Sequence, residues 1–461
     1  MKIERASPCR TRMLALYATI SLSLFWGRTL WANVGDIFGL GSRSAALAQA
    51  TTAWAFDGFA GYSNPAGLPL STQLEDNRRM ALSWGLLGMR PDFKPISGVT
   101  TTNSYTADRP RTGDVDVSYR STLGQALGLS YRLEDQAKAT LGLVFFLPLN
   151  QLAYLDTGEV YTPEYVLYRA RTQRPQMELA AGAELIPGFH AGAGLHVSFG
   201  LTSTADVLLQ SGEKPSTMKF RATLKPKAAP YFGFLFIPGS RGFSLGGVLR
   251  FPVAANNDMV LESGLPVLGQ VVPFKFSVES AVFYDPLTIQ LGSSWEATER
   301  WRILAELHYQ AWRNFKPPMV TLLGLPGGNP ISNSMNPTFS YRDILIPRLA
   351  HEISWGEKTV RLGYAYRPSI FKDLPNGPGN YLDPPQHIVT AGLGLRFKRF
   401  LHFNTPCSLD FHAGYHHLVA QQISKTPGDE TGNPAETKIG APGYDAGGKI
   451  LGGGVSLSLA I

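Results

Sequence analysis

Apolar and polar side chains alternate strictly along many short stretches of this chain. In residues 389–397, apolar side chains share one face, and small or polar side chains share the other. The apolar face holds Val389, Ala391, Leu393, Leu395 and Phe397, and the opposite face holds Thr390, Gly392, Gly394 and Arg396. A period of two is typical of a β-strand with one apolar face. The chain is therefore predicted to fold mainly as β-strands.

Fourteen stretches show this alternation, and we predict a strand at each. They span residues 80–89, 125–133, 139–149, 176–186, 189–201, 227–237, 243–251, 276–295, 301–312, 344–355, 359–367, 387–397, 408–418 and 449–461. The stretch at 276–295 contains Asp285-Pro286, which predicts a kink inside one long strand. The last stretch alternates up to Ile461, the final residue of the chain.

The predicted connections alternate between short and long. Short turns fall near 134–138, 187–188, 238–242, 296–300, 356–358 and 398–406, and long polar loops fall near 90–124, 150–175, 202–226, 252–275, 313–343, 368–386 and 419–448. Up-and-down transmembrane barrels have short periplasmic turns and long outer loops, whereas a soluble sandwich has no reason to sort its loops this way. We predict an all-β fold, a 14-stranded antiparallel transmembrane β-barrel in the outer membrane of a Gram-negative cell. The chain should enter the first strand and leave the last strand on the periplasmic side.

The first 32 residues have the features of a signal peptide. A basic stretch ending at Arg12 precedes the uncharged, mostly apolar residues Met13–Trp26. That run is shorter than the roughly 20 residues that a spanning helix needs. We predict cleavage after Ala32; the alternative is an uncleaved anchor or a buried helix. Once this segment is removed, Cys407 is the one cysteine left, so no intramolecular disulfide can form.

Charge excludes one class of partner. The whole chain carries 42 basic and 35 acidic residues, and residues 1–32 hold five basic residues against one acidic residue. The rest of the chain therefore has 37 basic and 34 acidic residues, a surplus of three. So small a surplus gives no reason to expect binding to nucleic acid.

Residues 33–79 lie before the first strand and show no strong strand pattern. They are rich in small residues and turn formers, as at 39–41, 45–50 and 64–68. A segment too short to form a core of its own, attached to a barrel, is expected to fold inside the lumen. We therefore predict a hatch over residues 33–79 that plugs a barrel of residues 80–461. The alternative is a periplasmic extension with local turns.

The N-terminal motifs resemble a known family. Phe38-Gly39-Leu40-Gly41, Asp57 and Asn64-Pro65-Ala66-Gly67-Leu68 resemble the hatch of the FadL-type long-chain fatty acid and hydrocarbon transport porins. The resemblance continues through Ala311-Trp312-Arg313-Asn314-Phe315, Arg361–Tyr366 and Asp410–Tyr415. It implies a plugged 14-stranded barrel, uptake of hydrophobic molecules, and lateral release through a wall opening at a kinked strand. The chain departs from the family in its single Asp57, where many members carry an acidic pair, and in its non-aromatic last residue.

The hatch residues that we expect to act in gating are Asp57, Asn64, Pro65, Ala66 and Gly67. Proline fixes φ, and glycine can adopt a positive φ, so conformations around Pro65 and Gly67 are restricted. Asn64-Pro65 is most simply a turn. The gating role rests on the family resemblance.

Inward glycines suit either a plug or close strand packing. Gly192, Gly194, Gly392 and Gly394 lie on predicted inner faces. The inward charged residues are expected to form ion pairs in the lumen, unless one arginine holds a ligand carboxylate; they are Arg361, Arg367, Arg396, Glu306 and Asp410.

Two apparent sites are discounted. The sequence Gly242–Gly246 matches a hydrolase nucleophile elbow, but that motif needs a strand–turn–helix setting, and here it begins a strand. His412 and His416 would be about 13 Å apart on a strand, too far to share one metal ion. We expect both to face the lumen, with His417 on the opposite face.

Tryptophans at strand ends suit interfacial girdles or packing against a plug. They are Trp84, Trp295, Trp301, Trp312 and Trp355. Trp301 and Trp355 lie beside short turns and are the better candidates for a periplasmic girdle.

The sequence thus favours passive uptake of long-chain fatty acids or related hydrophobic compounds, by a monomer surrounded by outer-membrane lipids. The alternative is a structural or secretion-associated barrel that holds a protein partner. We expect no enzymatic activity, no cofactor and no metal site. The substrate-binding residues cannot be named from the sequence.

Overall fold

The computed structural model describes residues 38–73, 79–103, 111–133, 139–150, 162–168, 174–208, 217–239, 242–267, 270–315, 321–324, 339–372, 380–398, 405–425, 437–439 and 442–461. The predicted signal peptide lies outside these residues. No helix within them is long and apolar enough to cross a membrane.

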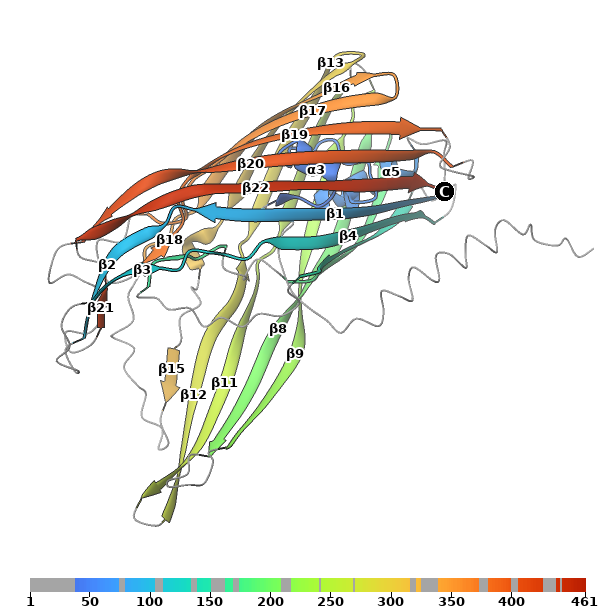
Figure 1. Ribbon diagram of the computed structural model, residues 1–461. Helices are drawn as coiled ribbons and strands as arrows, with labels where there is room; N and C mark the ends of the chain where they lie inside the picture. Colours follow the sequence, from blue (N-terminus) through green and yellow to red (C-terminus); the bar gives the residue numbers. More distant parts are fainter. Residues whose placement is uncertain are drawn as a thin grey trace, which may run out of the picture.

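Fourteen antiparallel strands form a closed barrel (Figure 1). In order around the wall they are β1 (Met80–Phe93), β4 (Thr122–Arg132), β5 (Ala139–Pro148), β7 (Gln176–Ile186), β8 (Phe189–Leu208), β9 (Thr217–Phe236), β10 (Phe243–Arg250), β13 (Thr288–Thr298), β14 (Trp301–Gln310), β16 (Ile344–Trp355), β17 (Lys358–Arg367), β19 (Gln386–Phe397), β20 (Cys407–Ser424) and β22 (Gly443–Ala460). Pairing of β1 with β22, from Ala81↔Ala460 to Phe93↔Gly448, closes the ring. The predicted strand number and fold class are confirmed.

Alternation sorts side chains between the outside and the lumen as predicted. In β19, Val389 and Leu393 are 52% and 39% exposed, whereas Thr390 between them is 6% exposed. His412 and His416 face the lumen and His417 faces outward. Closure places every wall strand between two partners, so the backbone groups of the ladder are paired and the outer apolar face can meet lipid.

The short turns that the structure describes, at 187–188, 296–300 and 356–358, lie at the same end of the barrel as the start of β1 and the end of β22. The Met80 amide donates to the Ile461 carbonyl at 2.9 Å. Trp301 and Trp355 are exposed beside short turns, as predicted, but Trp312 is buried in the lumen at 8% exposure. Trp312 therefore packs inside the barrel and does not belong to an outer girdle.

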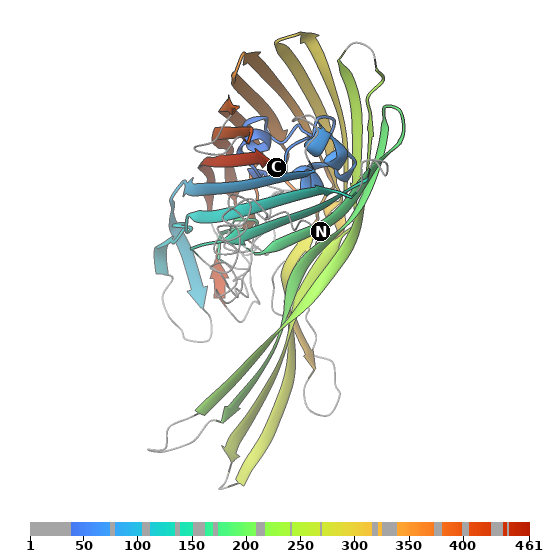
Figure 2. The ribbon, with the colours of Figure 1, turned by 90° about the vertical axis from the view of Figure 1, so that its right-hand side faces the viewer.

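Two predicted long loops are largely strands. Strands β8 and β9 continue through most of 202–226, and β11 (Val253–Val267) and β12 (Gln270–Asp285) occupy 253–285. Figures 1 and 2 show the far halves of β8 and β9 leaving the barrel with β11 and β12 as an arm. Polar composition misled the prediction here, because this arm lies outside the barrel, where strands need no continuous apolar face.

The arm begins where strand pairing changes. The last β7–β8 pair is Met177↔Val197, and beyond it β8 pairs in parallel with β11, from Thr202↔Asp258 onward. Prolines lie in or next to neighbouring strands at about the same height along the barrel as this change of pairing. They are Pro148, Pro175, Pro230, Pro252 and Pro286. Proline cannot donate to a ladder, so strands bend or end at it. The single kinked strand predicted over 276–295 is wrong, because the chain breaks at Asp285-Pro286: β12 ends at Asp285, and β13 begins at Thr288. We call the end of β7–β8 pairing near Gln176 the seam.

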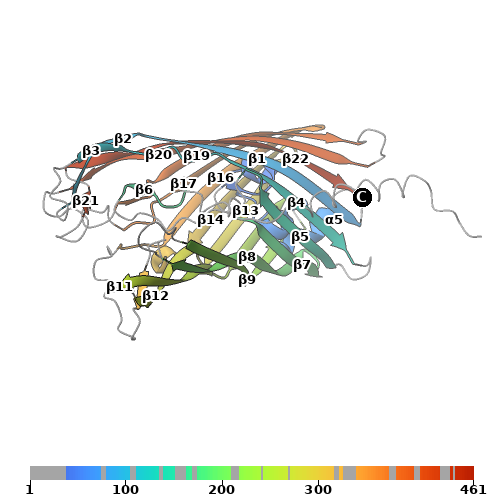
Figure 3. The ribbon, with the colours of Figure 1, turned by 60° about the horizontal axis from the view of Figure 1, so that its bottom comes forward.

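Smaller elements fill the long-loop end. Strands β2 (Ile96–Asn103), β3 (Arg111–Val115) and β21 (Thr437–Ile439) form a separate sheet, and β6 (Glu164–Tyr165) pairs in parallel with β18 (Tyr381–Leu382). Strand β15 (Thr321–Gly324) pairs with β12, and η2 (Trp312–Asn314) follows β14. Figure 3 shows the wall strands β1, β4, β5 and β7 side by side.

Candidate functional site

Residues 38–73, which we call the luminal segment, lie inside the ring of strands (Figures 1 and 2). They contain the helices α3 (Ser42–Ala46), α4 (Ala60–Ser63), η1 (Pro65–Gly67) and α5 (Leu68–Gln73). Helix α3 contacts β17, β19, β20 and β22, whereas η1 contacts β7, β8 and β9. Nearly all of the segment is buried. It therefore bridges distant parts of the wall across the lumen.

Asn64 holds the turn at η1 and attaches it to the wall. Its side-chain oxygen accepts a hydrogen bond from the Ala66 amide at 3.0 Å. Its amide nitrogen donates to the carbonyls of Thr52, at 2.8 Å, and Phe234 in β9, at 2.9 Å. Pro65 occupies the first position of η1, where a missing N–H is tolerated. The predicted turn residues thus lie together, against the wall.

Gly67 is required by a close backbone approach. A Cβ at this position would lie 2.2 Å from the Ala55 carbonyl oxygen. Gly67 does not use the positive φ that glycine permits, because it is not among the positive-φ glycines of the described chain. Space, and not backbone strain, excludes larger residues here.

Wall glycines make room for the luminal segment at some positions only. A Cβ on Gly192 would meet Pro65 at 2.4 Å, and one on Gly392 would meet Ala46 at 2.4 Å. Gly194 instead lies against Tyr231, and Gly394 against Arg361 and Asp410. Both uses predicted for inward glycines therefore occur, two positions each.

A buried ion-pair network attaches α3 to the wall. Arg43 Nε and Arg361 Nε share the Glu352 carboxylate, at 3.2 and 2.7 Å, and Arg361 also donates to Asp410 at 2.5 Å. The Arg43 guanidinium lies 4.0 Å over the Phe56 ring. A second wall contact joins Arg302 to the Trp54 ring at 3.7 Å. Charges that are costly to bury are thus neutralised between the segment and strands β16, β17 and β20, and β14 adds a cation–π contact.

Asp57 lies beside this network in a polar cleft between the segment and the wall. The cleft is lined by Arg43, Asp57, Arg361 and Asp410, and at the short-turn end by Arg396 and Ser408. Asp57 accepts a hydrogen bond from the Phe59 amide at 2.9 Å. Burial raises the pKa of Asp57, and the neighbouring Arg43 opposes that rise. The polar lining makes this cleft a poor route for a greasy molecule.

Of the charged residues predicted to pair in the lumen, four do so. Arg361 pairs with Asp410, Arg367 with Asp383 at 2.9 Å, and Glu306 with Arg348 at 3.2 Å. Arg396 is exposed at the short-turn end of β19.

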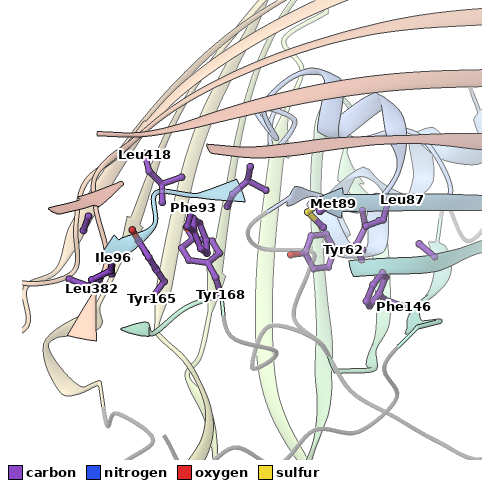
Figure 4. Packing of buried hydrophobic residues seen from close by; sticks show 14 of the residues in the cluster. Tyr62, Leu87, Met89, Phe93, Ile96, Phe146, Tyr165, Tyr168, Leu382 and Leu418 are labelled. Carbon is purple, nitrogen blue, oxygen red and sulfur yellow. The ribbon is translucent and has the colours of Figure 1, made fainter. Parts of the chain in front are cut away.

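An apolar cluster runs along β1 from the long-loop end to the luminal helices (Figure 4). At one end the Phe93 ring stacks on Tyr165, with centroids 4.1 Å apart, and meets Tyr168 edge-on at 5.7 Å. At the other end Leu87 and Met89 lie near Tyr62 of α4. Leu87 and Met89 also line a small cavity with Phe38, His412 and His416. We call this cluster the apolar column; its buried members are at most 8% exposed.

A second aromatic cluster lies near the seam and the long-loop end. Its rings come from η2 and from the segments before β16 and around β18, and they are Trp312, Phe315, Phe339, Tyr341, Phe371 and Tyr381, with Tyr284 beside them. Phe339 stacks on Tyr381 with centroids 5.1 Å apart. Strand β18 pairs with β6, so this cluster adjoins the first one through Tyr165 and Tyr381.

Sequence reasoning missed Arg43 and Glu352 as site residues. Arg43 is the one charged residue between Asp36 and Asp57, which was a usable signal for a buried pair. Glu352 faces inward by simple alternation in β16. Tyr165 and Tyr168 carried no such signal, because they lie in a loop whose path depends on pairing with β18.

The two apparent sites that were discounted from the sequence, a hydrolase nucleophile and a metal site, do not form in the described residues. Ser244 lies in β10 and donates to the Ala53 carbonyl at 2.7 Å. The described residues contain no cluster of three or more His, Cys, Asp or Glu side chains suited to a metal ion.

Solved structures with this fold are known, although no protein-family model and no curated protein matches the chain. A FadL homologue from Pseudomonas aeruginosa superposes with a TM-score of 0.60 at 14% identity, over 91% of this chain and 98% of that one. The Pseudomonas putida toluene transporter TodX gives 0.52 at 15%, over 92% and 99%. The Ralstonia pickettii toluene transporter TbuX gives 0.50 at 13%, over 93% and 100%. The resemblance to FadL-type porins is thus confirmed at the level of the fold.

Replacing Glu352 by Gln should destabilise the folded protein strongly. The change leaves Arg43 and Arg361 sharing a neutral amide, and breaking a buried pair costs about 3–5 kcal/mol. Glu296→Gln is the matched control, because Glu296 pairs with Arg302 near the surface at 2.8 Å and such pairs contribute about 1 kcal/mol or less. The stability of both variants is measured by urea titration, with the fraction of protein that runs as the folded band on a gel as the readout. Equal midpoints for the two variants would contradict this role of the network.

Gly67→Val should disturb the luminal segment and leave the wall folded. Its side chain would collide with the Ala55 backbone, which belongs to the segment. Hydrogen exchange should rise in residues 38–73 and stay unchanged in β1 and β22. Gly113→Val is the control, because nothing lies within 4 Å of a Cβ there. Unchanged exchange in the segment would mean that it tolerates the side chain.

Proposed function

We propose that this chain is an outer-membrane transport protein for passive uptake of long-chain fatty acids or related hydrophobic compounds. One observation carries the proposal: a closed barrel with an apolar outer face holds, inside its lumen, a buried segment and a continuous apolar column. An aqueous pore has no use for either feature. The fold likeness to proteins described as toluene transporters supports the same reading.

Capture follows from burial of apolar surface. Each methylene moved from water into an apolar site contributes about 0.8 kcal/mol. The column that begins at Phe93 and Tyr165 offers such a site at the long-loop end. Hydrophobic compounds cross a polar outer leaflet poorly, so a protein that binds them there speeds entry without an energy source.

We take the luminal segment to be a hatch, with Asn64, Pro65, Ala66 and Gly67 as its gating turn and Asp57 beside the cleft. This assignment is supported by the attachment of Asn64 to Thr52 and to Phe234 of the wall. The turn can move only if those hydrogen bonds break. The polar cleft at Asp57 disfavours apolar exit towards the short-turn end.

We place lateral exit at the seam. There β7 and β8 stop pairing at Met177↔Val197, and prolines interrupt adjacent strands. Buried polar atoms without a hydrogen-bond partner gather on the same two strands, including both amide atoms of Gln176 and Oγ of Ser198. Unsatisfied groups weaken the wall at this point. A substrate leaving here would enter the surrounding lipid directly.

Uptake tests the proposed function. Cells that lack their own hydrophobic transporter and express this chain should take up labelled fatty acid or alkylbenzene faster than cells with an empty vector. Protein extracted gently should contain bound hydrophobic molecules by mass spectrometry. A stoichiometric protein partner with no bound lipid, and no gain in uptake, would instead support a scaffold.

A reversible crosslink tests the exit. The double variant Met177→Cys/Val197→Cys in a Cys407→Ser background should, when oxidised, hold the two strands together at the seam and slow uptake. Reductant should restore it. Ala181→Cys/Ala193→Cys joins the same strands nearer the short turns and is the control. Equal uptake by both oxidised variants would mean that the exit lies elsewhere in the barrel.

A further inference from the structure

The arm leaves the barrel at the outer boundary of the membrane-spanning wall. Strand β8 pairs with β7 over Phe189–Val197, and a tilted strand needs about 9–11 residues to cross a bilayer. Beyond this stretch β8 continues to Leu208, and β9 runs back from Thr217. Figures 1 and 2 show that the far halves of both strands project sideways from the ring and do not continue along the barrel axis. An upright barrel therefore carries the arm out over the surrounding membrane.

The two faces of β8 and β9 stay the same from the wall into the arm. The register of these strands runs from Phe189↔Phe236 into the arm without a shift, so alternate residues keep their faces. On the wall, Leu195 of β8 and Phe232 of β9 lie on the outer face, where they are 47% and 48% exposed. When an upright strand bends outwards, the face that was turned to lipid becomes the face turned to the membrane surface. The same alternate positions therefore face lipid along the wall and the outer leaflet under the arm.

That face of the arm is mostly apolar. One row across the sheet joins Phe220 of β9 to Ala205 of β8, then to Leu261 of β11 and to Phe276 of β12. Neighbouring rows of the same face add further apolar residues, which are Met218, Ala222, Leu224, Leu201, Val207, Met259, Phe274 and Val278. Serines at 203 and 263 interrupt the rows, so the alternation is weaker than in the wall. A contiguous apolar face of this kind marks a contact with protein or membrane.

The opposite face of β9 is basic. It holds Lys219, Arg221 and Lys227, whose side chains are exposed, and β9 contains no acidic residue. Opposite Arg221 and Lys227 on β8 stand the uncharged residues Thr204 and Ser198. The acidic residues of this face lie on the other strands of the arm, and they are Asp206, Asp258, Glu262 and Glu279. Strand β9 is therefore the positively charged side of the arm.

The outer edge of β9 is a poor surface for another β-strand. Strand β10 pairs with β9 at Tyr231–Phe236, so in the described chain the far half of β9 has a strand partner on one side only. Pro226 and Pro230 cannot donate to a ladder, and lysines and prolines are typical of edges that resist pairing with another chain. Growth of the sheet through a second copy is therefore disfavoured, and the apolar face is the surface that needs a cover.

We propose that the arm lies on the outer leaflet of the membrane, with its apolar face against the acyl chains and the basic residues of β9 beside the lipid phosphates. Lipopolysaccharide, the phosphorylated glycolipid of that leaflet, fits both surfaces because its phosphates stand just above its acyl chains. Amphipathic elements bury their apolar side about 5–10 Å into this boundary. Long lysine and arginine stems reach from there to the headgroups. This contact holds β8 and β9 to the membrane beside the seam, whatever molecule the barrel carries.

Quenching by lipid-bound nitroxides tests the contact. The mature protein with Cys407→Ser receives one further substitution, Leu224→Cys or Thr223→Cys, on opposite faces of β9, and the new thiol is labelled with an environment-sensitive fluorophore. Leu195→Cys, on the lipid-facing wall, is the positive reference. The nanodiscs contain lipopolysaccharide and a phospholipid with a nitroxide on its acyl chain. We expect the label on Leu224→Cys to be quenched at least threefold more strongly than that on Thr223→Cys, and about as strongly as the reference.

Two results would overturn the proposal. Equal, weak quenching of the labels on Leu224→Cys and Thr223→Cys would mean that the arm stands clear of the membrane. A blue-shifted label on Leu224→Cys that lipid nitroxides do not quench would mean that a second copy, another part of this chain or a bound apolar molecule covers the face.

A charge variant tests the phosphate contact. Arg221→Gln/Lys227→Gln should weaken the affinity of the detergent-solubilised protein for lipopolysaccharide at least threefold. Lys94→Gln/Lys449→Gln removes the same number of charges and is the control, because these lysines are already paired with Asp445 and Asp92. It should leave the affinity unchanged. Equal affinities of the arm variant and the wild type would overturn the assignment of phosphates to β9.

Discussion

Charge neutralisation inside a closed wall is the constraint on which this structure depends. A barrel satisfies its backbone groups strand by strand, so its inward side chains must find partners within the lumen. Arg361, Glu352 and Asp410 on the wall form a network that is completed by Arg43 from the luminal segment. That shared carboxylate ties the segment to strands far away in sequence. The ion-pair network also neutralises charges that would otherwise attract anions and water.

The position of the luminal segment follows from two kinds of contact. Ion pairs hold α3 against one side of the wall, and the Asn64 amide with close glycine contacts holds η1 against the other. Neither contact would be sufficient for a segment of this length, which cannot form a core by itself. Between them lies the apolar column, where we propose that ligand binds, and the polar cleft at Asp57 lies towards the short-turn end. The division gives the lumen one greasy side and one charged side.

Strand positions could be read from the sequence because a period of two is imposed locally. Strands β7 and β16 begin and end at the predicted residues, 176–186 and 344–355. The arm could not be foreseen, because its sequence resembles a polar loop and the arm lies outside the barrel, where no apolar face is required. Inward facing of Arg361 and Asp410 was predictable from alternation, but the sharing of Glu352 between Arg361 and Arg43 was not. That pairing joins residues 309 positions apart, and sequence spacing carries no such information. The requirement for Gly67 was predictable as a residue, although the reason is the Ala55 carbonyl and not a positive φ.

The central claim is that the luminal segment seals the barrel. If it did not, solutes would diffuse through an open pore and transport would not require binding. This claim is tested most directly by deleting residues 38–73 and recording conductance across a planar lipid bilayer. The account predicts that the wall, whose β1–β22 pairing does not involve the segment, still inserts and now gives discrete open-channel steps, whereas the intact chain stays near the baseline. An inserted deletion variant with the same conductance as the intact chain would contradict it.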